Sequence, residues 1–117
     1  MIYKWNIFFA DLNPVIGSEQ KVIRPVLIIS DEDYSTLMPV VTILPITSLK
    51  SKRRIYLNEV LINAEQENIA GLTGNSIILA HQIRTISKKR LINNIGKIED
   101  LEIKQNIDEA LRIHLNL

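Results

Sequence analysis

Two polar residues of this 117-residue chain stand at the ends of aliphatic segments, where they are candidates for chemistry. Arg24 opens residues 24–30 (RPVLIIS), and Thr47 closes residues 40–47 (VVTILPIT); both runs are typical of buried strands. A guanidinium there is costly unless it has an anionic partner or faces a cleft, so Arg24 is a candidate ligand for a phosphate or carboxylate. Thr47 offers a hydroxyl, although at a strand end a hydroxyl often only caps the backbone.

Further polar side chains extend this candidate site. The segment GSEQ places Ser18, Glu19 and Gln20 in a row, although a plain surface turn has the same composition. Gln82 and Arg84 are two positions apart in a predicted strand and therefore share one of its faces. That face is either solvated or able to contact base edges and phosphates.

The two histidines, His81 and His114, lie far apart in the sequence, and no cluster of further metal ligands surrounds either. His81 shares its predicted strand face with Leu79 and Ile83, which indicates a partly buried, hydrogen-bonded side chain, while the adjacent Gln82 leaves a functional role open. His114 lies near the end of the last predicted helix, where the helix dipole favours a cation and a structural role is expected. A transition-metal site is therefore not expected.

Several catalytic classes are disfavoured by what the sequence lacks. The absence of cysteine removes disulfides, thiolate nucleophiles and sulfur-ligated zinc. The sequence has no glycine-rich phosphate loop, no histidine pair at helical spacing and no Gly-x-Ser-x-Gly motif. Its acidic residues are scattered singly, whereas a two-metal nuclease needs clustered carboxylates. We therefore expect neither a metal nor a cofactor.

Charge is distributed unevenly along the chain, although the formal net charge is only +1. Residues 99–117 carry a net −3, and residues 1–98 carry a net +4. Four of the bases fall within residues 49–54 (LKSKRR), where we expect a loop. The basic body is compatible with a nucleic acid partner that is bound through a few phosphate contacts.

The elements that position these side chains are mainly strands. Aliphatic and β-branched runs predict strands at residues 7–12, 24–30, 40–47, 55–61, 76–87 and 95–98. Residues 15–23 have no clear period and predict a loop, and residues 88–91 predict one helical turn.

The last predicted element is an amphipathic helix. Asp100 is its expected N-cap, and an apolar stripe follows at Ile103, Ile107, Ala110 and Leu111. Strands followed by one long helix predict a single α+β domain over residues 1–117, with a mostly antiparallel, strongly curved sheet. No segment has the length and composition of a signal peptide or a membrane span, so a cytosolic protein is expected.

Four segments, taken in order, resemble the MazF/PemK family of toxin endoribonucleases from bacterial toxin–antitoxin modules. They are ADLNPVIGSEQ, RPVLIIS, LPITS, and QIRTISKKRL followed by IGKI. Together they extend over nearly the whole chain. The resemblance implies an SH3-like curved antiparallel β-barrel with short helices and a C-terminal helix, as in CcdB, MazF and PemK, and a cytoplasmic homodimer.

The same resemblance implies an activity, namely metal-independent, sequence-specific cleavage of single-stranded RNA that inhibits translation and growth. Arg24 and Thr47 match the arginine of the R-P motif and the threonine of the P-I-T motif, and so are the implied catalytic pair. The residues implied to bind RNA are Ser18, Glu19, Gln20, Gln82 and Arg84. The implied partner is a small antitoxin whose acidic segment covers the RNA groove; DNA is reached only through the antitoxin, and no membrane is involved.

The residue types fit that reaction. Without a metal, the 2′-hydroxyl of the RNA is the nucleophile, and the protein aligns it, moves protons and stabilises the charged phosphorane. Arg24 supplies paired donors to the phosphate and Thr47 one hydroxyl donor. The general base stays open among His81, Glu19 and a bound water. His81 occupies a position that is commonly aspartate in the family, which makes it a candidate for proton transfer.

Two further positions differ from the family pattern. Trp5-Asn6 replaces the usual Gly-Asp before the first strand, and Lys21-Val22-Ile23 replaces a stretch that often contains glycine. Two other function classes are also open: a non-catalytic CcdB-like toxin that binds a protein target such as gyrase, and a barrel that binds RNA without cutting it. The presence of Arg24 and Thr47 in their motifs favours the nuclease.

Overall fold

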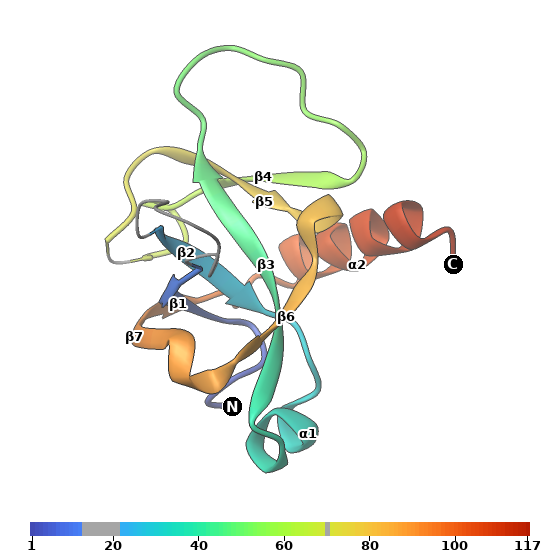
Figure 1. The fold of residues 1–117 in the computed structure, drawn as a ribbon. Helices are drawn as coiled ribbons and strands as arrows, with labels where there is room; N and C mark the ends of the chain where they lie inside the picture. The colour runs from blue at the N-terminus through green and yellow to red at the C-terminus, as the bar shows by residue number, and fades with distance from the viewer. Residues whose placement is uncertain (13–21, 70) are drawn as a thin grey trace, which may run out of the picture.

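The computed structural model describes residues 1–12, 22–69 and 71–117 (Figure 1). Within these ranges the strands are β1 (Asn6–Asp11), β2 (Ile23–Ile28), β3 (Val40–Ser48), β4 (Glu59–Asn63), β5 (Asn75–Leu79), β6 (Arg84–Ser87) and β7 (Leu91–Lys97). The helices are α1 (Glu32–Leu37) and α2 (Leu101–Leu115), and two 3₁₀ turns are η1 (Ala80–Gln82) and η2 (Lys88–Arg90).

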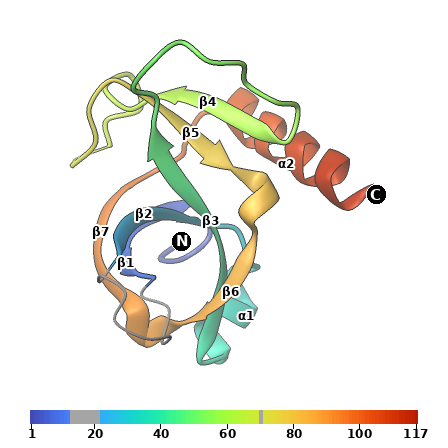
Figure 2. The same ribbon diagram turned by 45° about the horizontal axis from the view of Figure 1, so that its top comes forward.

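Every strand pair in the described ranges is antiparallel. The strand order is β4-β5-β3-β2-β1-β7, and β6 pairs with β3. β3 belongs to two parts of the sheet, because its first residues pair with β6 and its last residues pair with β5. Figure 2 shows β7, β1, β2, β3 and β6 curving around a ring, while β4 and β5 extend to one side, where α2 lies. The predicted α+β fold, a curved antiparallel barrel with short helices and a C-terminal helix, is confirmed.

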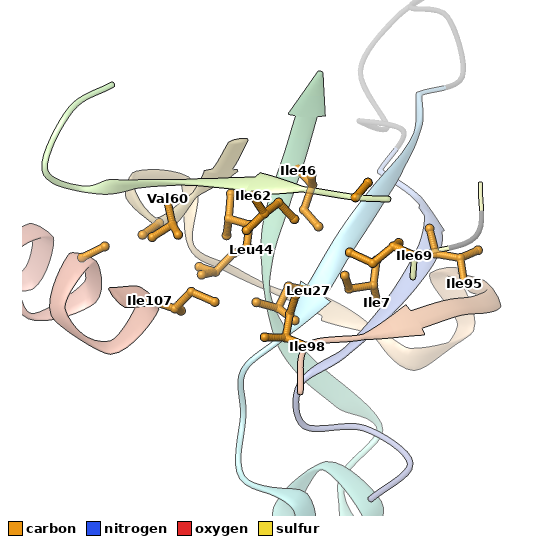
Figure 3. Close-up of a cluster of buried hydrophobic side chains, with 14 residues drawn as sticks. Ile7, Leu27, Leu44, Ile46, Val60, Ile62, Ile69, Ile95, Ile98 and Ile107 are labelled. Carbon is orange, nitrogen blue, oxygen red and sulfur yellow. The ribbon is translucent and has the colours of Figure 1, made fainter. Parts of the chain in front are cut away.

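The aliphatic runs of β2 and β3 supply two hydrophobic clusters, because both faces of each strand are buried. Leu27, Leu44 and Ile46 belong to a cluster that also contains Ile107 and Ala110 of α2 (Figure 3). Alternate residues of the same strands form the second cluster: Val26, Ile28, Val41 and Ile43. Burial on both faces specifies the register of the β2–β3 pair, since a slip by one residue would exchange the two sets.

Helix α2 begins where the sequence predicts. The carboxylate of Asp100 accepts hydrogen bonds from the backbone N–H groups of Glu102 and Ile103, at 2.8 and 3.2 Å, as expected of an N-cap. Ile107 and Ala110 are buried, which confirms the predicted apolar stripe. No helix in the described ranges is long and apolar enough to cross a membrane.

The start of the strand predicted over residues 55–61 is wrong, whereas residues 59–61 do belong to a strand. Residues 49–58 have no regular secondary structure, and β4 begins only at Glu59. The prediction depended on apolar side chains that are in fact exposed, Tyr56 and Leu57. An exposed apolar run carries the same sequence signal as a buried strand, which is why the two were confused.

The predicted strand over residues 76–87 is interrupted. β5 ends at Leu79, the η1 turn follows, and β6 begins at Arg84. Gln82 and Arg84 therefore do not alternate along one continuous strand, as the sequence predicted. The helical turn expected at residues 88–91 is confirmed as η2, and the strand expected at 95–98 is part of the longer β7.

Helix α1 is not predicted by periodicity, because its six residues are too few to show a repeat. The Asp31 side chain caps it by accepting from the N–H groups of Asp33 and Tyr34. The carboxylate of Glu32 accepts hydrogen bonds of 2.9–3.0 Å from three backbone N–H groups, those of Ile2, Tyr3 and Lys4. Helix α1 thereby fixes the N-terminal segment that leads into β1.

Trp5 occupies the left-handed backbone region, with φ of 69°. Glycine adopts this region freely, and glycine is the residue that the family pattern has here. Two ammonium groups lie close to the indole, with Nζ of Lys4 and Lys104 at 5.4 and 5.5 Å from the ring centroid. The side-chain amide of the neighbouring Asn6 donates to the carbonyl groups of Met1 and Lys4.

Candidate active site

The pairing of β2 with β3 brings the two main sequence candidates together. Val26 lies opposite Pro45 and Leu27 opposite Leu44. Arg24 lies two residues before Val26 and Thr47 two residues after Pro45, so both lie just beyond the paired residues at the same end of these strands. Both residues line the same depression there.

This depression has two parts that share Arg24, Thr47 and Val22. The part that we name the Lys50 hollow has a volume of about 470 Å³ and is completed by Ile23, Pro25, Ile46, Ser48, Lys50, Leu72 and Ser76. The part that we name the Gln82 hollow has a volume of about 460 Å³ and is completed by Leu12, Pro45, Leu79, Gln82 and Arg84. Arg24 and Thr47 thus lie where two adjoining spaces meet.

The charged side chains that line the depression, among the residues described, are all cations. Arg24 is exposed, and no hydrogen bond or ion pair joins its side chain to another described residue. Lys50 lines one hollow and Arg84 the other, while no Asp or Glu of the described ranges lines either. Guanidinium and ammonium groups without a carboxylate beside them favour an anionic ligand such as a phosphate.

The Lys50 hollow also contains a polar residue that the sequence analysis did not single out. Ser76 is only 2% exposed, and its backbone pairs with Ser48 in β3 and Ile62 in β4. Its hydroxyl makes no hydrogen bond to another residue that the structure describes. A serine inside a strand carries no sequence signal for a site, and only the packing of β5 between β3 and β4 reveals it.

The expected RNA-binding residues Ser18, Glu19 and Gln20 lie outside the described residues. The residues on either side of that gap are part of the depression. Leu12 donates its backbone N–H to the carbonyl of Val22 at 2.8 Å, and both residues line the Gln82 hollow.

His81 and Gln82 are neighbours within the η1 turn, but they have different surroundings. Gln82 lines the Gln82 hollow together with Arg84. His81 lines neither hollow; its Nε2 lies 3.2 Å from Oε2 of Glu59, and its side chain is 32% exposed. The ring of His114, from α2, lies edge-on to His81, with 6.5 Å between ring centroids. The structure therefore shows a partly buried, hydrogen-bonded His81, as its apolar neighbours in the sequence indicated.

Glu59 is the centre of a side-chain cluster that the sequence analysis missed. Arg53 binds its carboxylate through both terminal nitrogens. This pair of bonds lowers the pKa of Glu59 from 4.5 to about 2, and the hydrogen bonds from Tyr56 N–H and His81 contribute to the same shift. Burial acts in the opposite direction but is outweighed. No sequence signal joins positions 53, 59 and 81, because they meet only in the fold. No group of three or more His, Cys, Asp or Glu among the residues described here is placed to hold a metal ion.

Known proteins resemble this chain over nearly its whole length. A sequence model of the family described as PemK-like, MazF-like toxin of type II toxin–antitoxin system matches residues 3–115. Endoribonuclease EndoA of Bacillus subtilis (strain 168) is 38% identical over 117 residues, which are 100% of this chain and 97% of that protein.

Solved structures resemble the fold. Toxin MazF-mt6 of Mycobacterium tuberculosis has a TM-score of 0.75 at 26% identity, covering 96% of this chain and 97% of that one. A MazE–MazF structure from Deinococcus radiodurans has a TM-score of 0.76 at 20% identity, covering 98% and 96%. Since the family match and the 38% identical relative both extend over almost all residues, this chain belongs to the family of PemK-like, MazF-like toxins of type II toxin–antitoxin systems.

Proposed function

We propose that this protein is a toxin endoribonuclease that cuts single-stranded RNA at a short sequence without a metal ion, and so inhibits translation and growth. One observation carries the proposal. Arg24 and Thr47, the pair expected to be catalytic, are both part of the boundary between two adjoining hollows. A phosphate at that boundary has room for a nucleotide on each side.

The reaction needs no group beyond the RNA and the protein. The 2′-oxygen attacks the adjacent phosphorus and loses its proton to a base, while the bond to the 5′-oxygen breaks and that oxygen takes up a proton. Arg24 donates to the phosphate oxygens, whose negative charge increases in the phosphorane, and the Thr47 hydroxyl adds one further donor. Both groups accelerate the reaction because they bind the transition state more strongly than they bind the substrate.

The two hollows supply the contacts on either side of the scissile phosphate. Gln82 offers an amide that can pair with a base edge, and Arg84 offers a second cation for the RNA backbone. In the Lys50 hollow, Lys50 provides the cation and the buried Ser76 a hydroxyl for a base or ribose. Ser18, Glu19 and Gln20 complete the RNA-binding set that we propose.

Proton transfer by His81 stays a prediction. General acid–base catalysis by His81 would leave a pH dependence in the cleavage rate. If His81 transfers a proton, the His81→Ala protein loses activity in a pH-dependent manner between about pH 5 and 8. Full activity of that variant across the same range would leave Glu19 and a bound water as the candidates for the base.

The proposal includes the partners. A MazE–MazF structure and an endoribonuclease in complex with its cognate antitoxin are among the relatives of similar fold. We propose a homodimer in the cytoplasm that an acidic antitoxin segment inhibits by occupying the cationic depression. Contact with DNA occurs only through that antitoxin.

The deciding experiment is incubation of the purified protein with long single-stranded RNA in excess EDTA, followed by mapping of the new RNA ends. The expected result is cleavage at one short sequence, which the Arg24→Ala variant fails to produce. No cleavage by the wild type would reject the nuclease and favour a protein-binding toxin of the CcdB kind. Undiminished cleavage by the variant would reject the site.

A further inference from the structure

Glu59, the first residue of β4, is a buried carboxylate that the proposed mechanism does not use. Its side chain is 4% exposed. Oε1 accepts from Nη1 of Arg53 and from the backbone N–H of Tyr56, both at 3.0 Å. Oε2 lies 2.9 Å from Nη2 of Arg53 and 3.2 Å from Nε2 of His81. One carboxylate thus joins a segment before β4 to a turn after β5.

On one side, Glu59 holds the segment of residues 49–58, which has no regular secondary structure and arches away from the sheet (Figure 1). The segment is fixed at its start by a 3.0 Å hydrogen bond from Leu49 N–H to the carbonyl of Asn75. It is fixed again at Arg53 by Glu59. Only residues 50–52 lie between these two points, and Lys50 among them lines the Lys50 hollow.

On the other side, Glu59 holds the η1 turn. His81 is the central residue of this three-residue turn, which a hydrogen bond of 3.3 Å from Ile83 N–H to the Ala80 carbonyl closes. Short 3₁₀ turns have poor hydrogen-bond geometry and little stability of their own, so the bond from His81 to Glu59 fixes the orientation of this one. The next residue, Gln82, lines the Gln82 hollow.

We propose that Glu59 is a positioning residue for RNA: through Arg53 it places Lys50 at one hollow, and through His81 it places Gln82 at the other. Glu59 itself lines neither hollow, so it acts on RNA only through these neighbours. The inference rests on the proposed function of the Arg24–Thr47 site.

The Glu59→Gln substitution distinguishes two effects on RNA affinity: misplacement of the RNA-binding side chains and loss of the negative charge of Glu59. Removing a negative charge close to a cationic depression strengthens phosphate binding if charge alone matters. Loss of positioning has the opposite effect, because the glutamine amide offers one oxygen where the guanidinium of Arg53 needs two acceptors. The sign of the change in RNA affinity therefore distinguishes the two effects.

The first measurement is the affinity for a single-stranded RNA with 2′-O-methyl groups, which cannot be cut by attack of the 2′-oxygen. We expect Glu59→Gln and Arg53→Ala each to raise the Kd by about tenfold, as misplacement of binding groups does. Arg54→Ala is the matched control: it removes a cation from the same segment without breaking a bond to Glu59, and we expect about a twofold to threefold effect. The double variant should bind at most about twofold to threefold more weakly than Glu59→Gln, since the link between Glu59 and Arg53 is already broken there and only the cation of Arg53 is lost in addition.

The second measurement does not depend on RNA. Amide hydrogen exchange at Tyr56, whose N–H donates to Glu59, and at Ile83, whose N–H closes the η1 turn, should become faster in Glu59→Gln, while exchange in α2 and in the strands of the core stays slow. Slow exchange in the core shows that the variant is folded. On cleavable RNA, KM should increase more than kcat decreases, because the groups at the phosphate are untouched.

Two results would overturn the inference alone: RNA binding by folded Glu59→Gln that equals or exceeds that of the wild type, or unchanged exchange at both amides. A wild type that fails to bind RNA at all would overturn the proposed function and this inference with it. The binding measurement on the wild type therefore tells the two failures apart.

Discussion

The depression that contains Arg24 and Thr47 and the Glu59 cluster both contain charged side chains, but they differ in how those charges are paired. In the depression, Arg24 is exposed and unpaired with any described residue. In the cluster, Glu59 is buried, and both of its oxygens accept from Arg53 as well as from a further donor. An unpaired group costs little to remove but is available to a ligand, whereas a paired buried group contributes to stability. Substitutions in the two regions should therefore separate activity from stability.

The largest effect is expected at Arg24. Arg24→Ala should lower the initial rate of RNA cleavage by about 100-fold or more, because one preorganised donor group to the phosphorane is lost. The melting temperature should stay within about 2 °C of the wild type, since no described residue loses a partner. Arg112→Ala, at an exposed arginine of α2, is the control and should cut RNA at the normal rate. A large loss of stability in Arg24→Ala would contradict the expectation that substitutions in the depression change activity and leave stability unchanged.

A smaller loss of activity is expected at Thr47. Thr47→Val keeps the shape and removes the hydroxyl, and should lower the cleavage rate by about 10- to 100-fold. Thr47→Ser keeps the hydroxyl and should retain most of the rate. If the valine and serine variants cut RNA equally fast, the hydroxyl is not a donor in the reaction.

Substitution of Glu59 should change the free energy of unfolding and its dependence on pH. The folded pKa of about 2 lies below the ordinary 4.5, so the carboxylate stabilises the fold above pH 4.5, and this contribution disappears as the pH falls from 4.5 towards 2. Glu59→Gln should lower the free energy of unfolding at pH 7 by about 2 kcal/mol and flatten the acid part of the stability curve. Urea unfolding between pH 2 and 7 measures both. An unchanged acid dependence would mean that other carboxylates determine it.

The smallest effect is expected when the salt concentration is changed and the protein carries no substitution. RNA binding that uses a few phosphate contacts should weaken several-fold when salt is raised from about 50 to 200 mM, whereas the free energy of unfolding should respond little. Titration of the uncleavable RNA at each salt concentration gives the slope. A flat response would show that the cations of the depression do not contact phosphate.

Local patterns were enough to predict most of the regular elements and to single out Arg24 and Thr47 as separate candidates. The aliphatic runs predicted β2 and β3, and Asp100 with its apolar stripe predicted α2, because each signal lies within one element. These elements depend on burial along a single segment, which a periodic pattern indicates directly. That Arg24 and Thr47 line one depression follows only from the fold.

What the sequence did not predict depends on contacts between distant residues. Strand β4 was placed too early because exposed Tyr56 and Leu57 carry the same pattern as buried residues. The η1 turn divides a run of continuous apolar character, and the bond that fixes it comes from Glu59, which lies 22 positions before His81. Contacts between side chains from distant segments produce no periodic pattern in the sequence, so the Glu59 cluster can be identified only from the structure.

The position of Trp5 has a spectroscopic consequence. It is the single tryptophan of the chain, and its indole lies close to Lys4 and Lys104 and lines neither hollow. Intrinsic fluorescence excited at the indole band is therefore a local reporter of the N-terminal segment and its contact with α2. RNA that enters the depression should leave this emission nearly constant, whereas unfolding should shift it to the red as the ring becomes hydrated.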